Sequence, residues 1–538
     1  MMASGKMRVV LNQAVNREDL REMGIPPIGL AYLSAYVKAH ESDIEVEFAE
    51  SADEILASEP DVVGIAAVSQ NSGLANALAS ELRQKGFDGP LLMGGYHITG
   101  VPGSLSRDFD LGVLGEGEQT LLEVLRLIRD KGRSWKENRA GVPGICFSDG
   151  QAVVTTGRRE QIRPLDLVPH PDREMLADRW PPIHGSVHYV YSSRGCPYGC
   201  SFCSSSQFWG SARYFGAQYL LDELVDLAQR YHAASFFFYD DIFIADRKRL
   251  ETLADLMCAE GLSQEVESLC NVRASGLDDD VCRVLKRMNI NWVYLGLESV
   301  SDSVLQSVNK RATHQENVRA LQLLKQHDIK ITASFILGMP GETADDMKRT
   351  ASFIEESLGT LIDEFMVYPL IPFPGTAVWR NAVARWLIDE NPAPETMRRA
   401  TFSFHPDDYV YLNEAAPRDT FFFYLYYLRF IRLRHWLRRL LSTNYELGLL
   451  MGKHVQEIDA MKREMAQASD YVASLETQIH NKDGRLGVLE TQLTRQMNEV
   501  ALLQGRLTEG TDGKQARATR RKRMLGAVRR TRQPPSRG

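Results

Sequence analysis

The sequence predicts an α/β protein in which two successive parallel sheets are followed by a helical region and a coiled coil. Two series of short apolar runs separated by helix-length segments support this prediction, one from Met7 to about Ile128 and one from about Val187 to residue 385. Alternation of this kind is typical of βαβ units. From Ile458 to Leu507, apolar residues recur every three or four positions, which is the pattern of a coiled coil.

The first series predicts a Rossmann-like domain over residues 1–130. Its expected strands are MRVVL, IEVEF, DVVGIAAV, PLLMGG and DLGVL. Three of them run into loops rich in Gly, Ser and Thr, namely VSQNSG, GGYHITG and GEGEQT. Open α/β sheets bind ligands at the carboxyl ends of their strands, so this domain should bind a ligand there. Residues 131–185 are expected to be a linker with a small hairpin at VPGICFSDGQAVV.

The second series predicts a partial (β/α)6 barrel of the TIM type over residues 186–385. Its expected strands are HYVYSS, SFFFYDD, VESLCNVRA, WVYLGLES, ITASFILGMPG and EFMVYPLIPFPGT. The working face of such a barrel lies at the carboxyl ends of the strands. After it we expect a helical region at 386–450, a coiled coil at 455–508 and a disordered basic tail at 509–538.

Composition excludes several classes of protein. The chain has 538 residues, 44% of them hydrophobic, and only seven cysteines, too few for a disulfide scaffold. The N-terminus lacks the apolar core of a signal peptide, so we expect a cytoplasmic protein. The aromatic and basic stretch at 418–442 is expected to be a helix that caps the barrel, with membrane contact as the less favoured alternative. No recognition fold accompanies the basic tail, so we expect no nucleic-acid partner.

Three cysteines are close together in YSSRGCPYGCSFCSSS, at Cys196, Cys200 and Cys203. Thiolates suit zinc or iron-sulfur clusters, and zinc sites commonly add a second pair of ligands some distance along the chain. No compact fourth ligand follows here. Three thiolates can hold three irons of a 4Fe-4S cube and leave the fourth iron open for reaction. A zinc loop is the alternative. The other four cysteines lack this spacing and are expected to be small buried residues.

The pattern C-x3-C-x2-C, with Phe202 just before the third cysteine, resembles the radical S-adenosylmethionine enzymes. The resemblance implies that the open iron chelates the amine and carboxylate of S-adenosylmethionine. One electron from the cluster then cleaves this cofactor to a 5'-deoxyadenosyl radical. An electron donor such as flavodoxin or ferredoxin is implied as a partner.

The same resemblance covers residues 187–385 and implies further cofactor contacts. The segment Tyr239 to Asp241 would approach the methionine amine, and the FILGMPGE segment would lie along the adenine. Polar side chains after the next strands would approach the carboxylate and ribose, with a salt bridge at the barrel mouth as the alternative. For Lys310 the alternative is a solvated side chain. The expected cofactor-binding residues of the barrel are Phe202, Tyr239, Asp240, Arg273, Glu298, Gly338 and Pro340.

The first domain resembles the cobalamin-binding domain that precedes many such barrels. The segments IPPIGLAYLSAYV, DVVGIAAVS, GGYHITGVP and GEGEQT support this resemblance, which implies contacts with cobalamin at Ser69, Gly94, Gly95, His97, Thr99, Gly115 and Glu116. One departure matters. Where some cobalamin proteins have D-x-H-x-x-G, Gly95 occupies the aspartate position, and His97 lacks the carboxylate that would orient it as a ligand. We therefore expect cobalamin to be bound without a protein histidine.

Together these resemblances imply a cobalamin-dependent radical S-adenosylmethionine enzyme. Its expected reaction is methylation of an unactivated carbon of a small molecule or natural product, through the 5'-deoxyadenosyl radical and methylcobalamin. One alternative is a radical cyclisation or rearrangement without methyl transfer. Another is a degenerate enzyme that serves as a scaffold for the coiled coil. The heptads imply self-association or a partner helix.

Overall fold

The computed structural model describes residues 6–15, 25–177, 187–402 and 406–442, with side chains up to residue 436. Residues Met1–Arg429 group into one compact unit, which contains both sheets. The coiled coil at 455–508 and the basic tail at 509–538 lie outside the described residues and stay predictions. In the part of the chain that is described, no helix has the length and apolarity needed to cross a membrane.

The N-terminal sheet has seven strands in the order β2-β1-β3-β4-β5-β6-β7. Strands β1 to β5 are parallel, whereas β6 and β7 join antiparallel. Val9 of β1 pairs with both Val46 of β2 and Val62 of β3, so the strand order reverses between β1 and β3, which is where open α/β sheets bind ligands. The strands are β1 (Met7–Gln13), β2 (Ile44–Phe48), β3 (Val62–Ala66), β4 (Leu91–Gly94), β5 (Leu111–Val113), β6 (Ile145–Ser148) and β7 (Val153–Thr155).

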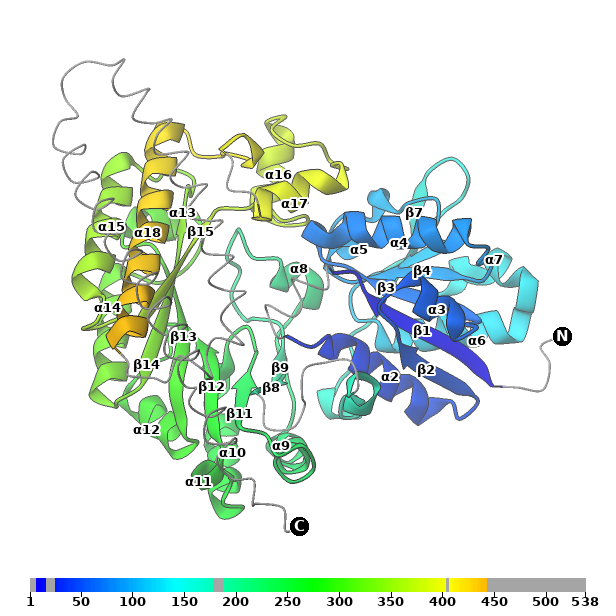
Figure 1. Ribbon diagram of the computed structural model, residues 1–538, viewed down its shortest axis with the longest axis horizontal. Coiled ribbons are helices and arrows are strands. Elements are labelled where there is room, and N and C mark those ends of the chain that lie inside the picture. The colour runs from blue at the N-terminus through cyan, green and yellow to red at the C-terminus, as the bar shows by residue number, and fades with distance from the viewer. Residues whose placement is uncertain (1–5, 16–24, 178–186, 403–405, 443–538) are drawn as a thin grey trace, which may run out of the picture. The chain divides into compact units, whose positions relative to one another are not determined.

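Helices cover both faces of this sheet, which confirms the Rossmann-like prediction. Figure 1 shows α4 and α5 on one side and α2 on the other. The small side chains Ala75 and Ala79 of α4 are fully buried against Val63 and Ile65 of β3, which lets helix and strand approach closely. The helices are α2 (Ile28–His40), α3 (Ala52–Ala57), α4 (Ser72–Gln84), α5 (Tyr96–Gly100), α6 (Glu118–Lys131) and α7 (Trp135–Asn138).

The second sheet is fully parallel, with the order β15-β14-β13-β12-β11-β8. All six predicted strands are present. The edge strands β8 and β15 stand at opposite ends of this order, so the sheet is open, and its curvature into a partial barrel stays a prediction. The strands are β8 (Val187–Val190), β11 (Ser235–Phe238), β12 (Glu267–Val272), β13 (Ile290–Glu298), β14 (Lys330–Leu337) and β15 (Glu364–Pro369).

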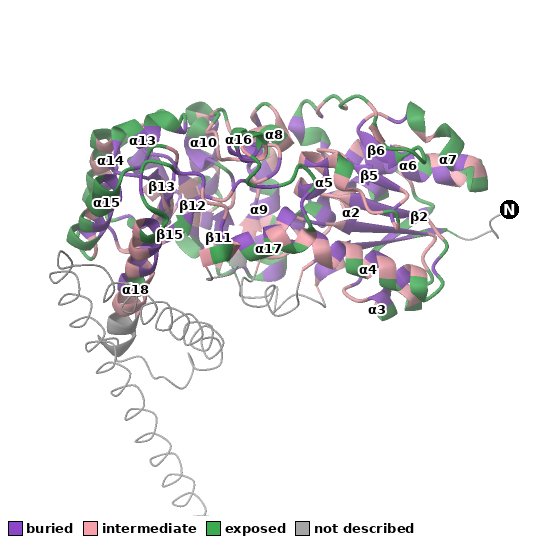
Figure 2. Ribbon diagram, turned by 90° about the horizontal axis from the view of Figure 1, so that it is seen from above, coloured by how far each residue is buried: buried purple, intermediate pink, exposed green. Residues whose placement is uncertain are grey.

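Four of the helices between these strands, α10, α12, α14 and α15, begin at a capping side chain. The side chain of Asp246 accepts a hydrogen bond from the backbone N–H of Arg249, and Thr313 and Thr343 form capping boxes. Figure 2 shows the strands buried and the outer faces of the helices exposed. These helices are α9 (Ala217–Tyr231), α10 (Arg247–Ala259), α11 (Leu262–Glu265), α12 (Asp279–Arg287), α13 (Asp302–Ser307), α14 (His314–Gln326) and α15 (Ala344–Ser357).

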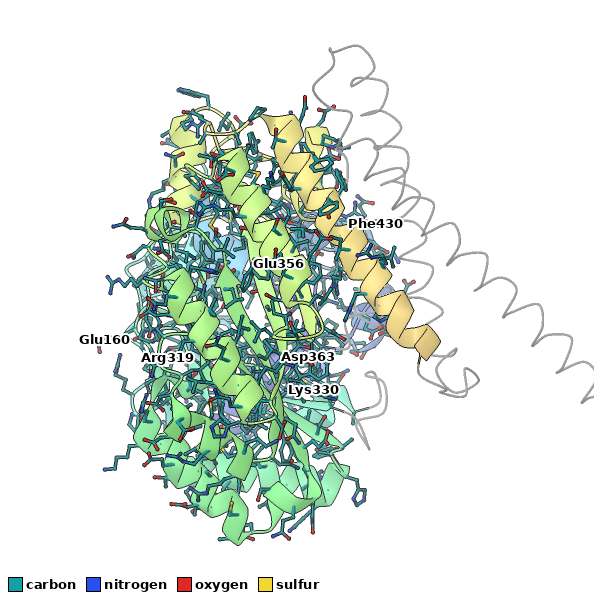
Figure 3. The ribbon with its side chains drawn as sticks, turned by 90° about the vertical axis from the view of Figure 1, so that its left-hand side faces the viewer. Glu160, Arg319, Lys330, Glu356, Asp363 and Phe430 are labelled. Carbon is teal, nitrogen blue, oxygen red and sulfur yellow. The ribbon has the colours of Figure 1, made fainter. Side chains whose placement is uncertain are left out.

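The predicted helical region at 386–450 contains α17 (Pro394–Phe402) and α18 (Arg418–Ser442), while α16 (Ala377–Ala384) begins the helices earlier, within the segment predicted as barrel. Figure 3 shows the first part of α18 running beside α15, and the hydroxyl of Tyr427 donates to the carboxylate of Glu355 at 2.7 Å. Phe421 and Phe422 are buried, as expected for a helix that covers the barrel.

Candidate functional site

The three clustered cysteines lie in the loop between β9 (Ser193–Arg194) and α8 (Ser205–Trp209). Gly195 starts the loop with φ +85°, and a Cβ there would lie 3.0 Å from the Cβ of Trp209. The loop is held from outside, because the N–H of Ser201 donates to the carbonyl of Val308 at 2.9 Å, and Asn309 Nδ2 donates to the carbonyl of Gly199 at 2.7 Å. These contacts fix the backbone that presents the thiols.

The three cysteines are half-buried and lie close to one another, in an environment that disfavours the charged thiolate form of Cys196 and Cys203. Burial raises the pKa of Cys203 to about 12, and the nearby Asp241, Cys200 and Cys196 raise it further. Burial likewise raises the pKa of Cys196. Bound iron would reverse this preference, since a coordinated thiol gives up its proton. Among the described residues, no three His, Cys, Asp or Glu side chains are grouped as ligands of a single metal ion. A cluster differs, because its thiolates bind separate irons.

Arg273 follows β12 and brings a buried guanidinium to this loop. Its Nη1 lies 3.7 Å from Cys200 Sγ, and its guanidinium carbon lies 3.9 Å from the ring centre of Tyr198. Its Nε donates to Ser275 Oγ at 2.6 Å. Its Nη2 is buried with no hydrogen-bond partner among the described residues. An unpaired buried donor is costly, so this atom fits an anionic group that the described part of the chain does not supply.

Asp240 and Asp241 follow β11 and have different surroundings. Asp240 is fully buried, and its two oxygens accept hydrogen bonds from Ser192 Oγ at 2.8 Å and Ser193 Oγ at 2.6 Å. Burial raises the pKa of Asp240 to about 6. Asp241 is an exposed residue whose carboxyl group lies near Cys196 and Cys203 and accepts a hydrogen bond from Ser205 Oγ, although partial burial of that group raises its pKa. Of these two carboxylates, Asp241 is therefore the one open to a ligand.

Tyr239, the residue before this acidic pair, is half-buried and packs against aromatic residues of neighbouring strands. Its ring is edge-on to Tyr189, with ring centres 5.3 Å apart, and contacts Phe237 in the same way at 5.1 Å. Phe202 of the cysteine loop packs against the buried side chains of Val304, Val308 and Met339. The contact of Tyr239 and Phe202 with the cofactor stays a prediction.

Glu298 and Lys310 form a buried ion pair at the end of β13. Lys310 Nζ lies 2.6 Å from Glu298 Oε1, and both residues are buried, so the solvated alternative for Lys310 is wrong. Glu298 has φ +65° at a register shift in β13, a conformation that a glutamate adopts only under local constraint. A Cβ on Gly296 would lie 2.6 Å from Glu298 Oε1, so glycine leaves room for the pair.

The GMPGE turn follows β14 and is supported by a buried acid. Glu342 Oε2 accepts hydrogen bonds from the N–H groups of Gly338 and Met339, at 2.6 and 3.3 Å. Burial raises the pKa of Glu342 to about 8, and its Oε1 has no partner among the described residues. Gly338 has φ +82° and lies under the ring of Phe421. The carbonyl of Pro340 accepts a hydrogen bond from a serine hydroxyl of α13 at 3.0 Å.

In the N-terminal domain, the predicted residues gather at the carboxyl ends of β3 and β4. Ser69 is buried at the start of a short 3-10 helix. Gly94 ends β4, and Gly95 has φ +100° with room for no Cβ, since one would lie 2.6 Å from the carbonyl oxygen of Ala67. The hydroxyl of Thr99 donates to the carbonyl of Gly95 at 2.8 Å. This close backbone packing suits a loop that holds a large ligand.

His97 lies in α5 and is buried. Burial lowers its pKa to about 4, so the imidazole is neutral. Its Nε2 is 3.0 Å from Ser104 Oγ, while its Nδ1 has no partner among the described residues. In the described part of the chain, no carboxylate is hydrogen-bonded to the ring, in agreement with the glycine at position 95. Binding of cobalamin without a protein histidine remains a prediction.

Gly115 and Glu116 follow β5 and link the two halves of the compact unit. The N–H of Gly115 donates to Thr99 Oγ1 at 2.9 Å. Glu116 Oε1 lies 2.9 Å from Arg194 Nη1 and 2.6 Å from Arg213 Nη2, so its carboxylate is already engaged and a contact with cobalamin stays a prediction. Both residues line a cavity of about 360 Å³ together with Phe208 of α8.

Sequence reasoning missed four participants in this region. Arg194 and Arg213 lie about eighty and a hundred residues from their carboxylate partner, and no local pattern reveals such a pair. Glu118, the third member of that network, lies in the predicted GEGEQT loop. Tyr198 lies between two cysteines, and its position in the loop was the available signal for its contact with Arg273. The predicted burial of Cys146, Cys270 and Cys282 is confirmed, whereas Cys258 is only half-buried.

Comparison with known proteins matches this division of the chain. The family model of the radical SAM superfamily matches residues 190–354, and that of the B12 binding domain matches residues 21–125. The chain is 30% identical over 376 residues to an uncharacterized methyltransferase of Pyrococcus horikoshii, which covers 68% of this chain and 80% of that protein. It is 26% identical over 342 residues to the anaerobic magnesium-protoporphyrin IX monomethyl ester cyclase of Cereibacter sphaeroides, over 60% of this chain and 55% of the cyclase.

A solved structure shares the fold across nearly the whole chain. The cobalamin-dependent S-adenosylmethionine radical enzyme OxsB, with aqua-cobalamin and S-adenosylmethionine bound, superposes with a TM-score of 0.59 at 16% identity, covering 92% of this chain and 84% of that one. The three thiols, the unpaired Nη2 of Arg273 and the close-packed loop at Gly95 fit the expected cofactors. The chain belongs to the cobalamin-dependent radical S-adenosylmethionine enzymes, whose cofactors are a 4Fe-4S cluster, S-adenosylmethionine and cobalamin.

Proposed function

We propose that the protein is a methyltransferase that methylates an unactivated carbon of a small-molecule or natural-product substrate. The supporting observation is that the loops assigned to the two cofactors meet. Tyr96 of α5, next to the Gly94-Gly95 loop, stacks on Phe208 of α8, next to the cysteine loop, with ring centres 4.1 Å apart. A substrate bound beside this contact would be close to both cofactors at once. The name of the relative from Pyrococcus horikoshii supports the same reaction class.

The bound cofactors supply a 5'-deoxyadenosyl radical on one side and a methyl carrier on the other. The chain's own residues bind and orient them. Cys196, Cys200 and Cys203 hold three irons. Arg273 offers its free Nη2 to the carboxylate of S-adenosylmethionine, and Asp241 accepts hydrogen bonds from the amine. An electron donor such as flavodoxin or ferredoxin supplies the electron.

The Glu298–Lys310 pair and the GMPGE turn complete this side of the pocket. The pair places one carboxylate and one ammonium group in a buried, fixed geometry near the ribose position. Glu342 orients the N–H groups of Gly338 and Met339 and so holds the turn against which the adenine lies. Burial of these groups also excludes water from a reactive radical.

The stoichiometry of the two cofactor products tests this proposal without knowledge of the substrate's identity. Methyl transfer consumes two molecules of S-adenosylmethionine per product, one leaving as 5'-deoxyadenosine and one as S-adenosylhomocysteine. The full chain, reconstituted anaerobically with iron, sulfide and hydroxocobalamin, would be supplied with fractions of a cell extract and with methyl-labelled S-adenosylmethionine. We expect both products in equal amounts, with the label in one small molecule.

A radical cyclase is the second candidate, favoured by the similarity to the cyclase of Cereibacter sphaeroides. A cyclase would form 5'-deoxyadenosine without S-adenosylhomocysteine and without label in the product, and this outcome would contradict methyl transfer. A scaffold protein with a degenerate site would form neither. The three outcomes are distinguished by one chromatographic separation.

A further inference from the structure

A buried network of four charged residues joins the cobalamin domain to the cysteine loop. Arg194 donates from Nη1 to Glu116 at 2.9 Å and from Nη2 to Glu118 at 2.5 Å. Arg213 donates from Nη2 to the same Oε1 of Glu116 at 2.6 Å. The two arginine side chains are 3–4% exposed and the two glutamates 5–11%. We call these residues the Arg194 cluster. Its two positive and two negative charges balance.

Further contacts hold the Arg194 cluster in one geometry. The guanidinium of Arg194 lies over the rings of Tyr32 and Trp209, at 5.1 and 5.3 Å from their centres. Arg213 also donates from Nη1 to the carbonyl of Ile162 at 3.0 Å. A guanidinium paired with carboxylates and packed on aromatic faces has few alternative positions, because its fork is planar and rigid. The Arg194 cluster therefore holds the elements that it joins in one relative position.

The position of the Arg194 cluster connects it to both cofactor loops. On the cobalamin side, Glu116 follows Gly115, whose N–H is bonded to Thr99, which is bonded in turn to the carbonyl of Gly95. On the barrel side, Arg194 is separated from Cys196 by one residue, Gly195. An unbroken series of hydrogen bonds and a few covalent links thus runs from the Gly94-Gly95 loop to the first cysteine.

Stability alone is a poor reason to bury four charges. Burying an ion pair removes both charges from water, and apolar residues of similar volume often stabilise a protein as well or better. A buried network in which one guanidinium bridges two carboxylates can instead contribute a defined geometry between the elements that it joins. For two cofactors that act on one substrate, a small error in their separation has a large effect on rate.

We propose that the Arg194 cluster sets the separation and orientation of the cobalamin loop and the cysteine loop, with Arg194 and Glu116 as positioning residues for the transfer between cofactors. The proposal rests on the proposed methyltransferase function. Loss of the Arg194 cluster leaves each cofactor site able to bind its cofactor, but the two sites no longer keep a fixed separation. The enzyme then still cleaves S-adenosylmethionine to 5'-deoxyadenosine but completes methyl transfer less often.

The test compares Glu116→Gln and Arg194→Lys with a matched control. Arg173 and Glu223 form another buried ion pair, with Nη2 and Oε1 2.6 Å apart and side chains 7% and 3% exposed, outside both cofactor loops. Glu223→Gln therefore disturbs a comparable pair elsewhere. The first readout needs no cofactor. Hydrogen–deuterium exchange of the apo chain should speed up at residues 94–117 and 191–206 in Glu116→Gln and Arg194→Lys, and stay unchanged there in Glu223→Gln.

The second readout is the ratio of S-adenosylhomocysteine to 5'-deoxyadenosine formed by the reconstituted full chain. For Arg194→Lys we expect unchanged iron and cobalamin content, 5'-deoxyadenosine formation within about twofold of the wild type, and a ratio of S-adenosylhomocysteine to 5'-deoxyadenosine about tenfold lower. Glu223→Gln should keep the wild-type ratio. An equal fall in the control, or a wild-type ratio in Arg194→Lys, would overturn the proposal.

A double variant covers the case in which single substitutions fail to fold. Glu116→Gln with Arg194→Gln removes one charge of each sign and keeps the Arg194 cluster neutral, yet it removes the ion pairs of Arg194 with Glu116 and Glu118. If this variant folds, loads both cofactors and keeps the wild-type ratio, the proposal is wrong. If the wild-type enzyme itself forms no S-adenosylhomocysteine, the proposed function fails. The exchange measurement still decides whether the Arg194 cluster holds the two loops together.

Discussion

Replacing Arg273 with lysine should weaken the binding of S-adenosylmethionine. The guanidinium of Arg273 is buried, stacked on Tyr198 at 3.9 Å, and has one nitrogen, Nη2, without a partner among the described residues. Lysine keeps the positive charge but has a single donor atom and no planar face. The variant therefore loses both the stacking contact and the charged hydrogen bond that Nη2 offers.

The expected loss follows from these two contacts. A hydrogen bond to a charged group contributes about 1.5–3 kcal/mol, and a cation–π contact about 0.5–2 kcal/mol. Because lysine recovers part of the charge interaction, a net loss of about 2 kcal/mol is expected, or roughly a 30-fold increase in Kd. Arg283→Lys is the control, since Arg283 is an exposed arginine of α12 that pairs with Asp279 and Asp280.

The assay is anaerobic equilibrium binding of S-adenosylmethionine to the reconstituted enzyme, with iron and cobalamin content measured on the same samples. We expect Arg273→Lys to keep its iron and cobalamin, and Arg283→Lys to bind like the wild type. An unchanged Kd in Arg273→Lys would refute the role given to its free nitrogen. Loss of iron instead would show that Arg273 acts on the cluster through Cys200, 3.7 Å away.

Three further predictions concern buried groups. Burial raises the pKa of Glu342 from 4.5 to about 8, so the folded chain binds this proton more tightly than the unfolded chain does. Its free energy of unfolding should therefore fall as pH rises from about 4.5 to about 8. Glu342→Gln should remove this pH dependence, measured as the difference in unfolding midpoint between pH 5 and pH 9. Gly95→Ala should abolish binding of hydroxocobalamin, followed by absorbance, because its Cβ would collide with the backbone of Ala67. His97→Gln should keep cobalamin bound with an unchanged cob(II)alamin spectrum in electron paramagnetic resonance, and a lost nitrogen coupling would contradict this.

Much of the fold is predictable from the sequence, because its strands are short apolar runs that end in loops of distinct composition. The strands DVVGIAAV and SFFFYDD are examples, and both appear where expected as β3 and β11. The hairpin at 142–154 was also expected, but its attachment to the N-terminal sheet was not. Pairing between β5 and β6 depends on contacts across some thirty residues, which no local pattern encodes.

The candidate site is predictable only where one segment contains the whole signal. Cys196, Cys200 and Cys203 are recognised together because their spacing is itself the motif. Side chains that act through partners far away in the sequence cannot be recognised in this way. Asp240 and Asp241 are adjacent in sequence, yet the structure buries one against serine hydroxyls and exposes the other. The engagement of Glu116 by two arginines is likewise a product of tertiary packing.

Formation of 5'-deoxyadenosine by the reconstituted full chain tests the central assignment most directly. The wild-type protein, reduced anaerobically with dithionite in the presence of S-adenosylmethionine, should form 5'-deoxyadenosine. Cys200→Ala should form none, because the three thiolates are all needed to hold the cluster and leave one iron open. The control Cys258→Ala removes a half-buried cysteine outside the cluster and should keep full activity. A Cys200→Ala protein that still cleaves S-adenosylmethionine would contradict the account.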